Sequence, residues 1–374
     1  MSRFLRALKR TAVAAAVGAL VVSVSTAGFA DDKKVRLKVQ SWFPTKVPHV
    51  GSQIKDIAAS VKAVTGGSVS MQLFEPGALI PPAECFDSVS NGAVDACWGI
   101  SGYYYGKNPA LAVFSALPFG PRWPELLAYF FEGGGKQQYD EIYARNNIKG
   151  LICGGTVAEA SGWFRNEIKT VEDFKGIKMR IFGLGGKVIE KLGGSAQLLA
   201  AGDIFPALEL GTIDATEFAM PAVDLKLGFY QVAKHYYFPG WHQPATLYEV
   251  IFNMDKWKSM SKTQRAQIEA TCGNNIGRAI AFGEANQFEA MKTLKAKGVT
   301  IHQWSPEILA AFKAAWEEVV AEESAKSPEF KQAYDTYTAF NQAKRGGGMR
   351  YSLRLGTRLK RGRRASSVNC LEHP

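Results

Sequence analysis

The segments GIKMRI (residues 176–181) and GTIDATE (residues 211–217) bound the stretch of this 374-residue chain that decides its fold. Each segment is predicted to hold a short apolar strand, and the two strands end near the ionisable side chains Arg180 and Glu217. The end of a strand beside a turn is where an α/β fold presents polar groups to a cleft. Arg180 offers a planar fork that matches a carboxylate, and Glu217 offers anionic oxygen to a metal ion or to a substrate hydroxyl.

Strands and helices alternate on both sides of this stretch, which predicts βαβ units with parallel strands. The expected strands cover residues 35–42, 68–74, 93–99, 150–156, 162–166, 177–182 and 213–218. The expected helices cover residues 48–65, 82–91, 187–192 and 204–210, and the pattern after Trp257 predicts long helices over 263–296, 307–321 and 328–342.

The body of the chain, residues 31–343, is long enough for two domains. We expect a first α/β domain over 31–155, completed by part of about 245–280, and a second over 156–244, completed by the C-terminal helices to about residue 343. Two similar α/β blocks that face each other enclose a cleft, and clefts between domains are preferred ligand sites. A long helix can bridge two such domains or form a dimer surface.

The two ends of the chain have their own signatures. Residues 1–30 combine a basic start, an apolar run and small residues before Ala30, which predicts a signal peptide cleaved after Ala30 and export to the periplasm. Residues 344–374 form a basic tail that is expected to be disordered, with a functional arm and a shifted reading frame as alternatives. The net charge of +11 divides into +4 before residue 31, +8 after residue 343 and −1 in between, so it offers no support for nucleic-acid binding.

The five cysteines show no CxxC pair and no histidine at metal-ligand spacing. An exported protein is free to form disulfides, but the sequence does not indicate a pairing. Buried free thiols are the prediction for Cys85, Cys97, Cys153, Cys272 and Cys370.

No catalytic signature stands out in the sequence. The histidines are scattered, and neither a nucleophile elbow nor an HExxH motif is present. The segment GLGGK (183–187) lacks the spacing of a phosphate-binding loop, so it is interpreted as a turn that lets the backbone approach a ligand or a neighbour.

Candidate binding residues follow three predicted strands or turns. Tyr103 and Tyr104 come directly after the strand at 93–99 and could line a pocket, with packing as the alternative. Glu159 follows the strand at 150–156, where a solvated loop charge is the simpler interpretation. Gln243 lies in the rigid aromatic turn FPGWHQP (238–244), which suits a pre-organised polar contact.

Taken together in order and spacing, several short motifs resemble the periplasmic solute-binding subunits of tripartite ATP-independent periplasmic (TRAP) transporters, the DctP-type family. The similarity is greatest to the branch that binds 2-oxoacids and related monocarboxylates, and it runs from about Val35 to about Phe340. The motifs are GAVD (92–95), LPFG (117–120), GWFR (162–165), KMR (178–180), GTIDATE (211–217) and YYFPGWHQP (236–244). The resemblance implies a type II-like binding-protein fold of two α/β domains around a ligand cleft, with a domain-spanning helix and no enzymatic activity.

The resemblance also implies roles for individual residues. Arg180 matches the arginine that pairs with the ligand carboxylate, Glu217 matches a carboxylate ligand of a cation beside it, and Phe218 matches a position that gives its backbone carbonyl to that cation. Glu159 and Gln243 fall where the branch usually has Gln and Glu, an apparent exchange that leaves the cation and the ligand open. Two carboxylates with amide and carbonyl oxygens suit a hard cation such as Na⁺ or Ca²⁺.

The expected function is therefore capture of a small carboxylate, such as pyruvate, for delivery to TRAP permease subunits in the membrane. A homodimer through the C-terminal helices is a further expectation of the resemblance. Two alternatives stay open: the same fold with another solute (a sugar acid, an aromatic carboxylate or a polyol), and a metal-assisted lyase or hydrolase with Glu159 or Glu217 as base.

Overall fold

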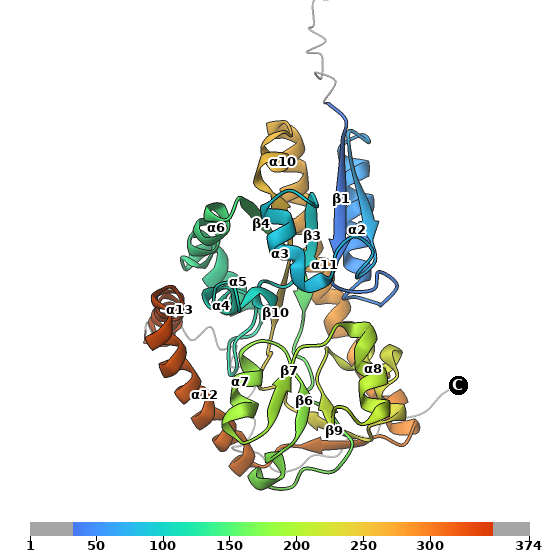
Figure 1. The fold of residues 1–374 in the computed structure, drawn as a ribbon, viewed down its shortest axis with the longest axis vertical. Helices are drawn as coiled ribbons and strands as arrows, with labels where there is room; N and C mark the ends of the chain where they lie inside the picture. The colour runs from blue at the N-terminus through green and yellow to red at the C-terminus, as the bar shows by residue number, and fades with distance from the viewer. Residues whose placement is uncertain (1–32, 347–374) are drawn as a thin grey trace, which may run out of the picture.

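The computed structural model describes residues 33–346, with two sheets that lie one above the other in Figure 1. The predicted signal peptide and all of the predicted basic tail after Gly346 lie outside the described residues. Of the described helices, none is both long enough and apolar enough to cross a membrane.

The first sheet has five strands in the order β2-β1-β3-β10-β4. The strand β1 pairs in parallel with β2 and β3, which confirms the βαβαβ prediction, whereas β10 is antiparallel to both of its neighbours. The strand β10 falls in the stretch 245–280 that was expected to complete the first domain, although no strand was predicted there. The strands are β1 Val35–Ser41, β2 Val69–Phe74, β3 Ala96–Gly99, β4 Ile148–Thr156 and β10 Thr246–Asn253.

Helices cover this first sheet. In α2 the buried positions Ile54, Ile57 and Val61 recur at helical spacing and pack into the core, although the helix begins at Ser52 rather than at the predicted residue 48. The short helices between residues 101 and 145 were not predicted. The elements are α2 Ser52–Val64, η1 Pro82–Glu84, α3 Cys85–Ser90, η2 Ser101–Tyr104, α4 Ala110–Val113, α5 Trp123–Glu132, α6 Gly135–Arg145 and α10 Met254–Lys258.

The second sheet has six short strands in the order β11-β9-β5-β8-β6-β7. Its β6 runs parallel to β7 and β8, while β5 is antiparallel to β8 and β9. The strands are β5 Gly162–Phe164, β6 Lys178–Arg180, β7 Ser195–Gln197, β8 Ala215–Thr216, β9 His235–Phe238 and β11 Thr300–Gln303. The helices around them are η3 Val171–Phe174, α7 Leu184–Lys191, α8 Ala201–Leu210, α9 Pro221–Leu227 and η4 Phe229–Gln231.

We call the part of the molecule built around the first sheet the first half, and the part built around the second sheet the second half. Three C-terminal helices connect the two halves, namely α11 Lys262–Ala296, α12 Pro306–Lys326 and α13 Pro328–Gly346. The long helix α11 packs on α2 and β4 of the first half and on α9 of the second, as the predicted domain-spanning helix should. The helix α12 packs on α7, whereas α13 packs on α4, α5 and α6 beside the first sheet (Figure 1). The division near residue 155 stays a prediction, with α13 on the side of the first sheet rather than of the second.

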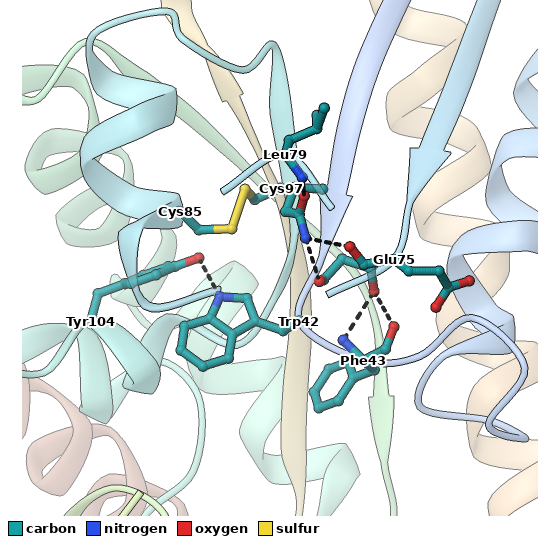
Figure 2. Close-up of a disulfide and its surroundings, with 9 residues drawn as sticks. Trp42, Phe43, Glu75, Leu79, Cys85, Cys97 and Tyr104 are labelled. Carbon is teal, nitrogen blue, oxygen red and sulfur yellow. Dashed lines mark hydrogen bonds between the residues drawn. A yellow bond between two sulfur atoms is a disulfide. The ribbon is translucent and has the colours of Figure 1, made fainter. Parts of the chain in front are cut away.

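The prediction of free thiols is wrong for four of the five cysteines. Cys85–Cys97 joins α3 to β3, as Figure 2 shows, and Cys153–Cys272 joins β4 to α11. Their Cα atoms lie 6.1 and 4.0 Å apart, although 12 and 119 residues separate the partners in sequence. Such pairings follow from tertiary proximity, which a list of cysteine spacings does not contain. Cys370 lies outside the described residues.

Candidate ligand and metal site

The centre of the site is an ion pair between Arg180 and Glu217. Arg180 is the last residue of β6, and Glu217 directly follows β8, whose Thr216 is in register with Arg180. Arg180 Nη1 donates to Glu217 Oε1 at 2.8 Å and to the Glu217 carbonyl at 2.7 Å, and the two side chains are 2% and 0% exposed. Parallel strands that end at the same edge therefore bring the two predicted residues together in the interior.

Further contacts hold this pair in place. The backbone N–H of Phe182 donates to the same Glu217 oxygen, and Arg180 Nε donates to the carbonyl of Leu199 at 3.3 Å. The Phe218 ring lies 5.3 Å from the guanidinium carbon, a cation–π distance. Burial is the largest single effect and raises the pKa of Glu217, but Arg180, the neighbouring His242 and the Phe182 N–H together lower it by more, so the pKa lies below the usual value and the carboxylate is ionised.

Glu159 approaches from the loop after β4. It is buried, and its Oε1 accepts from Thr156 Oγ1 at 2.9 Å and from Gln243 Nε2 at 3.4 Å. Burial, and secondly the negative charge of Glu217, raise the pKa of Glu159 well above its usual value. A carboxyl group in this position loses its proton readily only beside an added positive charge.

Gln243 and His242 come from the aromatic turn after β9. Gln243 Nε2 donates to Thr246 Oγ1 at 2.8 Å, so its amide is oriented with the carbonyl oxygen free. His242 is buried, with Nε2 at 3.7 Å from Glu217 Oε2. Sequence reasoning missed His242, because a single histidine in a turn carries no ligand spacing; its position next to Gln243 was the one available signal.

Unpartnered polar atoms gather at this place. Among the described residues, six buried side-chain atoms lack a hydrogen-bond partner, and five of them belong to Glu159, Glu217, His242 and Gln243; the sixth is Oε1 of Gln267. One ligand atom from each of Glu159, Glu217 and His242 lies within 4.8 Å of the others. Buried polar atoms without partners are unfavourable in a folded protein, so this cluster fits a site that a ligand and a cation complete. The residues present therefore fit a metal ion.

The two predicted tyrosines differ in their surroundings. The Tyr103 ring stacks on Trp42 at 4.2 Å and meets Phe182 edge-on at 5.0 Å; burial raises the pKa of its hydroxyl, and the positive charge of the nearby Arg180 partly offsets that rise. The Tyr104 hydroxyl instead accepts from the Trp42 indole N–H at 3.3 Å, as Figure 2 shows. The structure thus brings Tyr103 to the ionic cluster, while the contacts of Tyr104 are with Trp42 and Phe86.

Aromatic residues close the site between the two halves. Phe43, which follows β1, contacts Tyr103 and Tyr248 from the first half and Phe218 from the second, with ring centroids 5.5 to 6.3 Å apart. Because Arg180, Glu217 and Glu159 are all buried behind these rings, the described arrangement is that of a closed cleft. A groove of about 730 Å³ opens at the surface between residues 44–46, 75–82 and 200–203.

Comparison with known proteins places these features in a family. The sequence profile of DctP, described as bacterial extracellular solute-binding protein, family 7, matches residues 42–327. A monocarboxylate 2-oxoacid-binding periplasmic protein from Nostoc sp. is 36% identical over 304 residues, which cover 81% of this chain and 82% of the relative.

Solved structures show the same fold. A TRAP transporter solute-binding protein from Bordetella bronchiseptica, described with copurified calcium and picolinate, superposes with a TM-score of 0.82 at 35% identity and covers 84% of this chain and 94% of its own. A protein from Pseudoalteromonas atlantica, described with bound sodium and pyruvate, gives a TM-score of 0.80 at 29% identity and covers 84% and 95%.

Proposed function

Since this chain belongs to the DctP family of solute-binding proteins, the receptors of TRAP transporters, we propose that it captures a small 2-oxoacid such as pyruvate together with a metal cation. The observation that carries the proposal is the cluster of unpartnered buried oxygens and nitrogens opposite an arginine fork. The relatives described with pyruvate or picolinate and with sodium or calcium support the same ligand class.

In the proposed complex, Arg180 binds the carboxylate of the ligand. Its Nη1 is held by Glu217 and its Nε by Leu199, so the guanidinium is fixed before the ligand arrives. Tyr103 presents its hydroxyl beside the guanidinium, and Phe43 and Phe218 cover the remaining apolar surface of the acid. A small acid is favoured because the aromatic rings of the two halves already meet around this point.

Glu159, Glu217 and Gln243, with the Phe218 carbonyl, are the proposed holders of the cation. When bound, the cation supplies positive charge that offsets the carboxylates and the ligand. The free oxygens of Glu159, Glu217 and Gln243 face this place, and each has its second polar atom fixed by a neighbour such as Thr156, Phe182 or Thr246.

The arrangement of the two halves suggests how the ligand enters the site and how it is held there. We infer that the ligand enters through the groove beside residues 200–203, because these residues directly follow Leu199, whose carbonyl accepts from Arg180. Closure of the two halves then removes water from the ion pairs and strengthens them. The long helix α11, which packs on both halves, is the natural element about which they move.

Native mass spectrometry of freshly purified protein tests the proposal, because a retained acid and ion are weighed together. We expect a mass increment of one small monocarboxylate plus one cation, and calorimetric binding of pyruvate to protein freed of ligand. Retention of a sugar acid, an aromatic carboxylate or a polyol, without binding of pyruvate, would reject the ligand class.

We also propose where the protein acts, which partners it has and that it leaves its ligand chemically unchanged. The protein acts in the periplasm after removal of residues 1–30, delivers its ligand to TRAP permease subunits and performs no chemical conversion. Incubation with pyruvate, followed by analysis of the recovered acid, checks the last point, since a lyase or hydrolase would consume it. Gel filtration with light scattering tests the homodimer expected from the C-terminal helices.

A further inference from the structure

His242 stands out among the residues of the site. Its ring is almost completely buried, and neither ring nitrogen has a hydrogen-bond partner. A buried neutral histidine that serves only packing normally bonds through at least one nitrogen. In His49, for comparison, Nε2 bonds to the Gly155 carbonyl at 2.7 Å.

The backbone holds His242 in this position. A Cβ atom at Gly185, in the first turn of α7, would lie 3.0 Å from the His242 Cβ, so the glycine lets α7 pack closely against it. Gly185 belongs to the GLGGK segment, which was predicted to be a turn; from Leu184 onward it is instead the first turn of α7, and Gly185 lies close to a neighbour. The ring is thus directed toward Glu217 Oε2, at 3.7 Å, by the packing of the second half.

The charges of the site favour a divalent cation. Arg180 contributes one positive charge, and Glu159 and Glu217 contribute one negative charge each once both are ionised, so a bound monocarboxylate then leaves two negative charges in excess. A monovalent cation would leave one of them buried, whereas a divalent cation balances the site. Uncompensated buried charge is strongly unfavourable.

The donor set favours a particular class of divalent cation. Calcium and sodium are hard ions that prefer oxygen, whereas imidazole nitrogen suits zinc, copper, iron and nickel, and manganese accepts a mixed set of carboxylate and imidazole donors. One atom each from Glu159, Glu217 and His242 lies within 4.8 Å of the others, which leaves room for one ion between them. We propose that His242 is a metal ligand and that the site takes a divalent transition-metal ion such as Mn²⁺ or Zn²⁺. This inference rests on the proposed capture of an acid with a cation.

The test compares metal binding in three proteins stripped of metal with a chelator: wild type, His242→Asn and His235→Asn. His235 pairs with His302 at 2.9 Å on the second sheet, so its variant controls for metal bound at a more exposed histidine pair. Calorimetry gives the affinities for Mn²⁺, Zn²⁺ and Ca²⁺, and pulsed electron paramagnetic resonance of the Mn²⁺ form detects a coordinated imidazole nitrogen.

We expect the nitrogen coupling in wild type and His235→Asn, and its loss in His242→Asn. The dissociation constant for Mn²⁺ should rise at least tenfold in His242→Asn, with a change of less than threefold for Ca²⁺. Absence of the coupling in wild type, or its persistence in His242→Asn, would overturn the inference. Pyruvate binding to the Ca²⁺ form is measured on the same samples, so that loss of the histidine role can be told apart from failure of the proposed function.

Discussion

Glu217 and Glu249 are both completely buried, but their surroundings differ. Glu217 is paired with Arg180, keeps one oxygen without a partner, and has a pKa below the usual value. Glu249, on β10, accepts from the hydroxyls of Tyr139 and Tyr143, and burial raises its pKa to about 7. Glu217, in the proposed binding region, is kept ionised and incompletely bonded, whereas Glu249, in the core of the first half, is fully bonded. A free oxygen makes Glu217 available to a ligand, whereas Glu249 uses both of its oxygens in packing.

The substitution with the largest expected effect removes Arg180, the positively charged partner of Glu217. Arg180→Ala leaves Glu217 buried without its partner and takes away the fork for the ligand carboxylate. A ligand carboxylate that is buried without its charge partner loses about 3–5 kcal/mol, so calorimetry should show pyruvate affinity reduced by orders of magnitude. Arg165→Ala is the control, because Arg165 is an exposed arginine that directly follows β5 of the same sheet and bonds to the Leu208 carbonyl. Unchanged affinity in Arg180→Ala would break the assignment of the site.

The second test concerns the pH dependence that Glu249 contributes. Its folded pKa of about 7 lies above the unfolded value near 4.5, so the folded state binds the proton more tightly. The free energy of unfolding should therefore fall as pH rises from 4.5 to 7, by about 3 kcal/mol from this group.

Urea unfolding at several pH values measures this contribution. Glu249→Gln keeps an acceptor for the two tyrosines and should remove that part of the fall. Asp224, whose pKa burial also raises to about 7, stays in both proteins, so the difference between them isolates Glu249. Identical pH profiles would show that Glu249 is ionised in the folded state, like Glu217.

Glu217→Gln is the third test, and it addresses the proposed metal ligand. The amide keeps the shape of the side chain but removes the charge beside Arg180 and the anionic oxygen for the cation. Pyruvate binding should weaken roughly 10–100-fold and lose its dependence on an added divalent cation. Glu249→Gln should keep full metal dependence, since Glu249 lies with the tyrosines. Metal dependence that persists in Glu217→Gln would assign the cation to other ligands.

The same contrast shows what could be predicted from sequence. Arg180 and Glu217 could be found because strand ends are local features, and parallel pairing of β6 with β8 places them at one edge. The contribution of residues 245–280 to the first domain was expected, but the antiparallel pairing of β10 and the two disulfides could not be predicted, because their partners are distant in sequence and meet only through tertiary packing. His242 was missed because a single turn residue has no periodicity.

The sequence also does not distinguish between neighbouring residues on a tight turn. Tyr103 and Tyr104 both lie on η2, and the sequence gives the same reason to select either one. Their ring directions depend on the packing of Trp42 and Phe86, which decides which hydroxyl reaches the ionic cluster. Sequence reasoning therefore selects the segment, and only the packing distinguishes the surroundings of the two residues.

The smallest expected effect on pyruvate affinity is the difference between substitutions of Tyr103 and of Tyr104. Tyr103→Phe removes a hydroxyl close to Arg180, and a hydrogen bond of this kind contributes about 0.5–1.5 kcal/mol, so pyruvate affinity should fall roughly two- to tenfold. Tyr104→Phe removes a hydroxyl that accepts from Trp42 and should leave affinity unchanged while lowering the urea midpoint. Calorimetry and urea unfolding of both variants give the two readouts. If Tyr104→Phe weakened binding as much as Tyr103→Phe, the boundary between the binding region and the core would lie one residue further along the turn.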